Sequence, residues 1–411
     1  MQSTSGKQAD TDCQVKQLDR QWLGGTFFLV ILAVTLSQNF YDLLSVMDGA
    51  GLNLMAYEGP LFIKLLKDVV YSALLALSIA LLLRRGYLPI IPLTILLLIF
   101  AAFALSTVRH DLVTGLIGLR WSAPLILFML MADLPRLVHR KNSSWCLIFG
   151  LTICIGAQIY QLFNMPPIHG EVFGLAARTP GFFLAPNSAA FFACSSAACV
   201  AALMPNDRLL KIVSSVLAIT ICLLAQSGTG IITAAILIVW QFSGRINWSF
   251  AALGALVFAV LFLNLNAITM RNDYVAESGG IRVQVFMDVL AKSFDSFGDF
   301  GVYTNAAILR EGTLAPAFVL DSLWASLFGN FGLLSLLLFP LFALFVFVDM
   351  RHINWQRAMP AVITFFLFSM TTIVFEAFPM NLLLSLAIWC SLANDDPERR
   401  SNQQSPLRAE R

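Results

Sequence analysis

Residues 319–348 read VLDSLWASLFGNFGLLSLLLFPLFALFVFV, a run in which Asp321 is the one charged side chain. A helix of about 20 apolar residues is long enough to cross the hydrocarbon core of a bilayer. Runs of similar character recur along the chain, and we expect about twelve spans. They cover residues 22–38, 63–83, 87–108, 112–132, 143–163, 181–204, 211–226, 229–242, 248–268, 319–348, 358–376 and 379–393. The sequence therefore predicts an all-α fold, a polytopic membrane bundle.

The composition separates this chain from soluble proteins. Of its 411 residues, 58% are hydrophobic and 12% are charged, whereas soluble domains average about 25% charged residues. The net charge of +2 is small and the sequence has no basic face, which excludes nucleic-acid binding. The four histidines are scattered and no cysteine pair has C-x-x-C spacing. We therefore expect no metal site and no cofactor.

The chain divides into a leader, a bundle and a tail. Residues 1–21 are polar and lack the apolar segment of a signal peptide, and residues 394–411 are charged. Residues 22–393 form the bundle, which includes one long polar loop at residues 269–318. Lysine and arginine concentrate in alternate connections, which predicts that these connections and both termini face the cytoplasm. The long loop then faces outward.

The long loop is the second landmark of the sequence. At roughly 50 residues it is much longer than the usual connection between packed helices, and such loops are commonly functional. Residues 280–297 (GIRVQVFMDVLAKSFDSF) have the spacing of an amphipathic helix that lies in the membrane interface. We expect this helix to direct Arg282 toward an anionic substrate, with Arg310 as a further contact.

Two more arginines lie near the outer ends of predicted spans. Arg178 precedes Pro186 and Asn187, where proline should kink the helix or delay its start. Its guanidinium could reach lipid phosphate, or it could grip a substrate phosphate with paired hydrogen bonds. Arg120 lies about 12 Å inside its span, where an arginine must face the bundle interior or a wet cavity. It could pair with a carboxylate such as Glu376, or it could line an outward-open cavity for an anion.

The start of the run at residues 319–348 offers a carboxylate. Asp321 could complement the positive end of the helix dipole, which is a capping role. Alternatively, it could act as a general base at the outer mouth of the bundle, with Ser322 beside it as a substrate contact. The sequence leaves both roles open.

Taken in order, these landmarks resemble the O-antigen ligase and polymerase superfamily of bacterial envelope enzymes. The shared features are an R-x-x-G-x-x-x-x-P-N stretch, a serine in a turn between two spans, and a long loop. That loop opens with an arginine-bearing amphipathic helix and closes with a polar pair before a glycine-rich helix. The resemblance covers about residues 168–340 and is carried by Arg178, Gly181, Pro186, Asn187, Ser227, Arg282, Asp321, Ser322, Trp324, Gly329 and Gly332.

The resemblance implies a GT-C-like glycosyltransferase of the bacterial inner membrane. Such an enzyme takes a glycan from an undecaprenyl pyrophosphate carrier on the periplasmic face, without a metal, and transfers it to a hydroxyl. It also implies work alongside proteins that set polysaccharide chain length or export the product. Arg282, Arg178 and Asp321 would be catalytic, and Arg120, Asn187, Ser322 and Arg310 would bind substrate.

Two departures from the family pattern bear on the function. Gly228 follows Ser227 where the family often has arginine, and Asp321-Ser322 stands where ligases typically have His-Asn. The missing histidine favours a polymerase, which joins repeat units of a surface polysaccharide, over a ligase that transfers glycan to a lipid or protein acceptor. About twelve spans also suit a secondary transporter or a flippase for lipid-linked sugars. The absence of an internal repeat and of basic residues in the inner halves of the spans argues against both.

Overall fold

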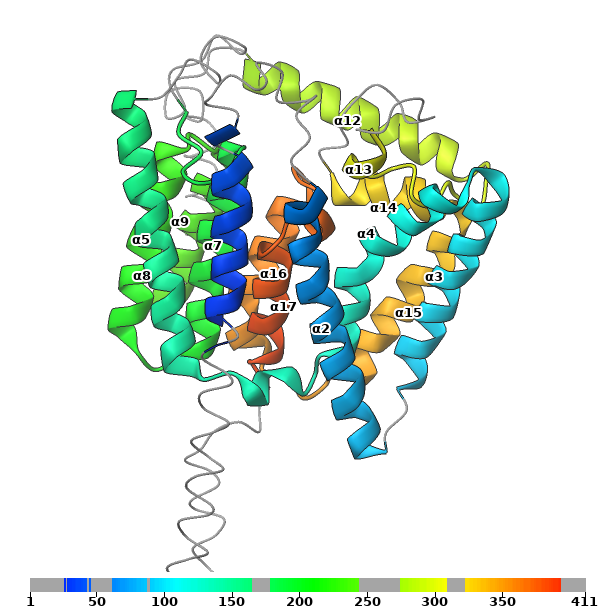
Figure 1. The fold of residues 1–411 in the computed structure, drawn as a ribbon, viewed down its shortest axis with the longest axis horizontal. Coiled ribbons are helices and arrows are strands. Elements are labelled where there is room, and N and C mark those ends of the chain that lie inside the picture. Colours follow the sequence, from blue (N-terminus) through cyan, green and yellow to red (C-terminus); the bar gives the residue numbers. More distant parts are fainter. Residues whose placement is uncertain are drawn as a thin grey trace, which may run out of the picture.

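The computed structural model describes residues 26–45 without 27 and 43, and residues 61–86, 89–164, 178–243, 274–308 and 322–392. These residues are almost entirely helical, which confirms the all-α prediction (Figure 1). The first helix is Phe28–Asp42. The others are α2 (Leu61–Arg85), α3 (Ile90–Arg109), α4 (Leu112–Leu130), α5 (Arg140–Asn164), α7 (Pro186–Leu203), α8 (Arg208–Leu224), α9 (Gly228–Ser243), α12 (Tyr274–Ser293), α13 (Asn305–Ile308), α14 (Leu323–Phe331), α15 (Ser335–Val348), α16 (Trp355–Ser369) and α17 (Met380–Trp389).

Helices occur at most of the predicted spans that the structure describes. Within the described residues, six helices are long and apolar enough to cross a membrane. At two of the predicted spans, a helix of the structure ends earlier than the sequence predicted. The run at 319–348 is divided by a 3₁₀ turn, η2 (Gly332–Leu334), because Gly332 has a φ of +48°. The span at 358–376 ends at Ser369 and is followed by a second 3₁₀ turn, η3 (Val374–Glu376). The span at 248–268 lies outside the described residues.

The bundle has two sides with a pair of helices between them. Helices α5, α7, α8 and α9 form one side, and α2, α3, α4 and α15 form the other (Figure 1). Helices α16 and α17 pack against α7 on one side, and α17 also contacts α4 on the other. Helix α7 is the most enclosed, and its small side chains, such as Ala190, Ala193 and Ala197, allow neighbouring helices to approach closely.

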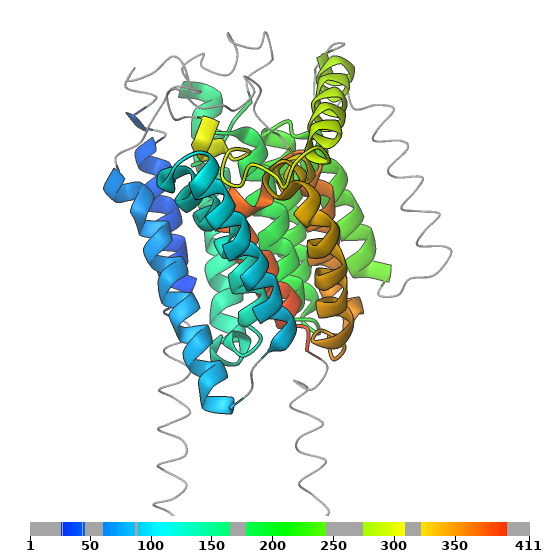
Figure 2. The ribbon, with the colours of Figure 1, turned by 90° about the vertical axis from the view of Figure 1, so that its right-hand side faces the viewer.

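Helix α12 lies across one end of the bundle, which we call the α12 end (Figures 1 and 2). It begins at Tyr274, six residues earlier than predicted, and packs against α14. It ends at Ser293, four residues before the predicted end, and in the segment that follows Gly298 and Gly301 adopt φ values of +87° and +91°, which favour glycine over other residues. Gly301 donates its N–H to Oδ1 of Asn330 at 2.7 Å, which ties the segment after α12 to α14.

Candidate functional site

A polar cluster lies between α2 and α4, near the α12 end. Nε of Arg120 on α4 donates to Oδ1 of Asp68 on α2 at 2.9 Å. The two side chains remain 40% and 28% exposed, so the pair borders open space and is not sealed in the core. Of the two roles that the sequence left open for Arg120, the structure shows a pair with a carboxylate, but the hydrogen-bonded partner is Asp68 and not Glu376.

Glu376 is nevertheless a member of this polar cluster. It ends η3, and its carboxylate oxygens accept the backbone N–H of Asn305, the first residue of α13, at 3.0 and 3.2 Å. Burial raises the pKa of Glu376 to about 7, while the positive charge of Lys67, the hydrogen bonding of Asn305 and the charge of Arg120 each oppose that rise. Two cations and two carboxylates from α2, α4 and η3 therefore share this region.

Two further polar groups connect the cluster to α17. The hydroxyl of Tyr71, one turn after Asp68 on α2, donates to Oδ1 of Asn381 at 2.6 Å. Nδ2 of Asn381 donates to the carbonyl of Phe375 at 2.9 Å, so η3 is tied to the start of α17. Asn381 is buried, and its amide is held from both sides. Two polar contacts thus lie one turn apart on α2, the first from Asp68 to Arg120 and the second from Tyr71 to the buried Asn381.

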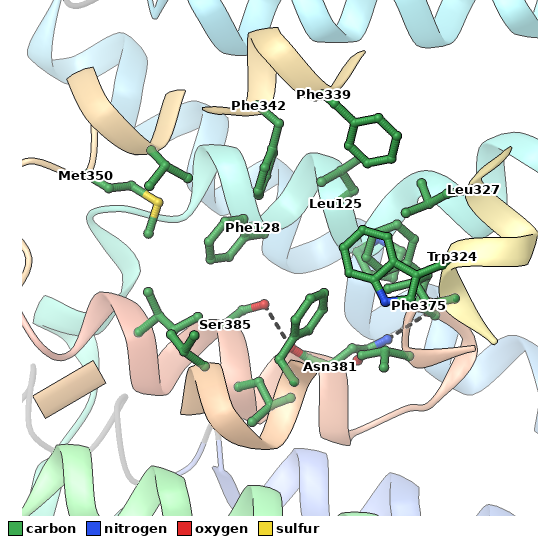
Figure 3. A pocket seen from close by; sticks show the side chains of 18 of the residues that line it. Leu125, Phe128, Trp324, Leu327, Phe339, Phe342, Met350, Phe375, Asn381 and Ser385 are labelled. Atoms are coloured by element: carbon green, nitrogen blue, oxygen red, sulfur yellow. Dashed lines mark hydrogen bonds between the residues drawn. The ribbon is translucent and has the colours of Figure 1, made fainter. Parts of the chain in front are cut away.

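Asn381 also lines an apolar cavity of about 360 Å³ (Figure 3). The cavity lies between α4, α14, α15, α16 and α17, and Leu125, Phe128, Leu327, Phe339 and Phe342 contribute to its wall. Its lining runs from the start of α14 (Trp324) and η3 (Phe375) to the connection between α15 and α16 (Met350) and the start of α16 (Trp355), and Figure 1 shows that connection at the end of the bundle opposite α12. Its volume lies within the range of roughly 300–1,000 Å³ that is usual for ligand sites, and its lining is almost wholly apolar.

A second polar arrangement forms around Asn187. Nη2 of Arg178 donates to Oδ1 of Asn187 at 3.2 Å, and Oγ of Ser227 donates to the same oxygen at 3.0 Å. Nε of Arg178 donates to the carbonyl of Ala225, which caps the C-terminus of α8, at 3.1 Å. A cation is favourable there because the C-terminal end of a helix carries partial negative charge. The structure thus brings together three of the residues that carry the family resemblance.

Helix α5 holds the backbone of the Arg178 segment in place. Nε2 of Gln158 donates to the carbonyl of Thr179 at 2.9 Å, and Oε1 of Gln161 accepts the N–H of Gly181 at 2.9 Å. Gly181 has a φ of +65°, which explains a glycine at this turn. Arg178 is 8% exposed, so its guanidinium is a buried anchor between α7 and α8 and does not extend to lipid phosphate.

The remaining predicted site residues lie on α12, on α14 or outside the described residues. Arg282 is partly buried on α12, whose Val289 is buried and whose Phe286 ring lies 6.3 Å from that of Phe328. Ser322 is the N-cap of α14, since its Oγ accepts the N–H of Ala325. It therefore takes the capping role considered for Asp321. Asp321 and Arg310 lie outside the described residues.

The three arginines are distributed over different parts of the fold. Arg120 bonds to α2, Arg178 bonds to α7 and α8 beyond α16 and α17, and Arg282 lies on the helix across the α12 end. The sequence did not point to Lys67, Asp68 or Tyr71 as site residues. The signal was present, because three charged residues, Lys64, Lys67 and Asp68, and a tyrosine fall within the predicted span at 63–83, which is otherwise apolar.

Comparison of the chain with models of known families, with curated proteins and with solved structures gave no match. Within the described residues, no group of three histidine, cysteine, aspartate or glutamate side chains is arranged to hold a metal ion. The chemistry of the site therefore has to be inferred from the polar cluster at Arg120 and from the apolar cavity beside it.

Proposed function

We propose that this protein is a membrane glycosyltransferase that joins oligosaccharide units carried on undecaprenyl pyrophosphate into a surface polysaccharide. The observation that carries the proposal is one juxtaposition. Trp324 and Phe375 line an apolar cavity at the α12 end, and Asn381 in its wall accepts a hydrogen bond from Tyr71, which follows Asp68 of the charged cluster by one turn of α2. A long apolar chain with an anionic head group is the class of ligand that matches both parts.

The cavity suits the lipid part of this substrate. Leu327, Phe342 and Leu125 line it with branched and aromatic side chains, and its length follows the helices from the α12 end toward Met350. Removing an apolar chain from contact with water yields about 25 cal/mol per Å². Within a bilayer that gain largely disappears, because lipid is equally apolar. The cavity then selects a chain by shape, and a branched isoprenoid chain fits a wall of rings and branched side chains.

The cluster suits the diphosphate part. Arg120 and Lys67 supply positive charge, and a guanidinium stays charged and can bind two phosphate oxygens at once. In the transfer, an acceptor hydroxyl oxygen forms a bond to the anomeric carbon. The anomeric carbon–oxygen bond to phosphate breaks, and its electron pair leaves with the lipid diphosphate. Each fixed cation aimed at that developing charge contributes about 2–4 kcal/mol.

Residues from the α12 end complete the proposed site. Arg282 adds a cation from α12, and Ser322 offers a polar contact to sugar, as Arg310 and Asp321 would beyond the described residues. Asn187, in contrast, lies with Arg178 on the other side of α16 and α17. Arg178 binds the end of α8 and Asn187. Its effect on the reaction therefore has two parts, the anchoring of this region and a contact to the diphosphate. A polymerase is favoured over a ligase because the His-Asn pair of ligases is missing.

The charge distribution supports an orientation with the α12 end outward. The opposite end carries eight described basic residues in short connections or next to them: Arg84, Arg136, Arg140, Lys141, Arg208, Lys211, Arg351 and Arg357. Basic residues in short connections mark the cytoplasmic side. We therefore place the α12 end in the periplasm and, with twelve spans in the inner membrane, both termini in the cytoplasm.

Labelling of single cysteines placed at Asp295 and Arg84 tests this orientation. In intact spheroplasts an impermeant maleimide should reach the cysteine at 295 and not the one at 84.

A flippase for lipid-linked sugars is the second candidate, because the cavity extends toward the opposite end of the bundle. A flippase must also carry the hydrophilic sugar across, and the apolar wall of the cavity offers the sugar few hydrogen-bond partners.

One assay separates the functions. The purified protein is incubated in detergent with undecaprenyl-diphosphate-linked oligosaccharides extracted from cells that lack it. A ladder of longer products supports the polymerase, and a single transfer to an added lipid acceptor indicates a ligase. Unchanged oligosaccharide rejects both, and movement of the substrate across a vesicle bilayer then supports a flippase.

A further inference from the structure

Glu376 occupies an unusual position for a carboxylate. It follows directly after Val374 and Phe375, which line the cavity, and it lies in the connection between α16 and α17 at the α12 end. In the proposed function the lipid chain fills the cavity and the diphosphate lies beside Arg120. The anomeric carbon of the sugar is bonded to that diphosphate, so it must lie close to η3.

The groups that face Glu376 come from three elements. Lys67 lies on α2, Arg120 lies on α4 and is bound to Asp68 of α2, and the backbone N–H of Asn305 comes from α13. Asp68 is engaged by Nε of Arg120, whereas Glu376 accepts its hydrogen bonds from a neutral backbone group. Among the residues that the structure describes, Asp68 forms a direct ion pair and Glu376 does not, so Glu376 is the carboxylate that can exchange a proton without breaking one.

We propose, on the basis of the proposed function, that Glu376 is the general base that accepts the proton of the acceptor hydroxyl. As that oxygen bonds to the anomeric carbon, its proton moves to a carboxylate oxygen of Glu376. The bond between the anomeric carbon and the phosphate oxygen breaks, and the electron pair leaves on the diphosphate near Arg120 and Lys67. The neutral Glu376 then returns its proton to water. This role was earlier considered for Asp321.

The protonation behaviour of Glu376 fits this role. A base works best when its pKa lies near the working pH, and burial raises the pKa of Glu376 to about 7. The carboxylate is the active form, so turnover should rise about tenfold per pH unit below the pKa and level off above it. Glu376 has a structural role as well, because it caps α13 through Asn305. The test must therefore separate proton transfer from capping.

Glu376→Gln makes this separation, because the amide oxygen of glutamine can still accept the N–H of Asn305 but cannot take a proton at neutral pH. We expect turnover of the extracted lipid-linked oligosaccharide to fall by about 10²–10⁴-fold and the acidic limb of the pH profile to disappear. Binding of undecaprenyl diphosphate should be unchanged or tighter, since a negative charge beside Arg120 is removed. Asp299→Asn is the matched control: it removes a carboxylate at the same end, one that contacts His110, and should keep the wild-type profile.

The outcomes are distinct. If wild-type protein forms no longer products, the proposed function fails before Glu376 is tested. If wild-type protein is active but its rate is independent of pH over about pH 5–8, the general-base role of Glu376 is rejected without any variant. Near-normal turnover in Glu376→Gln, with the acidic limb retained, rejects it as well. Loss of diphosphate binding together with turnover would reduce Glu376 to a structural cap of α13.

Discussion

Nε of Arg120 lies 2.9 Å from Oδ1 of Asp68, and this pair joins α4 to α2 at the mouth of the bundle. Both side chains keep part of their surface exposed, so the pair can open toward a bound anion. Partly exposed ion pairs contribute little to stability, about 0–1 kcal/mol. Phosphate and carboxylate compete for the same guanidinium, and this competition leads to the first prediction.

Arg120→Gln should abolish polymer formation, whereas Asp68→Asn should leave it largely intact. The reason is that, of this pair, Arg120 contacts the diphosphate and Asp68 does not. The loss in Arg120→Gln corresponds to about 2–4 kcal/mol of transition-state stabilisation. The measurement is product length on a gel, with membrane levels determined by immunoblot. The double variant, Arg120→Gln with Asp68→Asn, is the control for a structural pair. Recovery of polymer in the double variant would show that Arg120 acts only by neutralising Asp68.

Arg178→Ala should reach the membrane but form no polymer, and its unfolding free energy should fall by about 1–3 kcal/mol. The destabilisation arises because the Ala225 carbonyl and the Asn187 amide lose a buried donor. Ser227→Ala is the matched variant: it removes the other donor to Asn187 and leaves Arg178 in place. We expect it to keep making polymer. Equal loss of polymer in both variants would mean that Arg178 only anchors this region. Thermal unfolding in detergent provides the stability readout.

Arg282→Ala should also abolish polymer formation at normal membrane levels, because a cation is withdrawn from the α12 end. Lys292→Ala provides the control on the same helix, since Lys292 is exposed near its last turn. That variant should form wild-type product. Long-chain polymer from Arg282→Ala would remove Arg282 from the mechanism. The comparison requires only cells that lack the wild-type chain and a gel of the extracted polysaccharide.

Gly301→Ala should destabilise the protein by more than about 2 kcal/mol, because alanine is strained at a φ of +91° and its Cβ would collide with the Thr114 carbonyl on α4. Gly280→Ala, on α12 where a Cβ meets open space, should instead stabilise the helix by about 0.5–1 kcal/mol. The midpoints of thermal unfolding measure both changes. A Gly301→Ala midpoint equal to wild type would contradict the close approach of residues 298–304 to α4.

Hydrophobic run length was enough to predict the helices, because a membrane requires about 20 apolar residues per span whatever the fold. It could not predict the division at Gly332, since a positive φ leaves no trace in hydropathy. Site residues were harder. Arg120 was found because an arginine within a predicted membrane span is rare, but its partner Asp68 depends on how α2 packs against α4. Likewise, Ser322 and not Asp321 caps α14, a choice made by local backbone geometry.

The most direct test of the account is photo-crosslinking from within the cavity. A benzophenone amino acid replaces Phe342, which lines the cavity, or Leu337, which lies on the same helix and is 57% exposed toward the surrounding lipid. Irradiation in the presence of the undecaprenyl-diphosphate-linked oligosaccharide should give a covalent adduct at position 342, detected by mass spectrometry. Added undecaprenyl diphosphate should suppress this adduct by competition, and Arg120→Gln should weaken it. Position 337 should give no suppressible adduct. Equal, non-suppressible labelling at both positions would contradict a cavity that holds the lipid of the substrate.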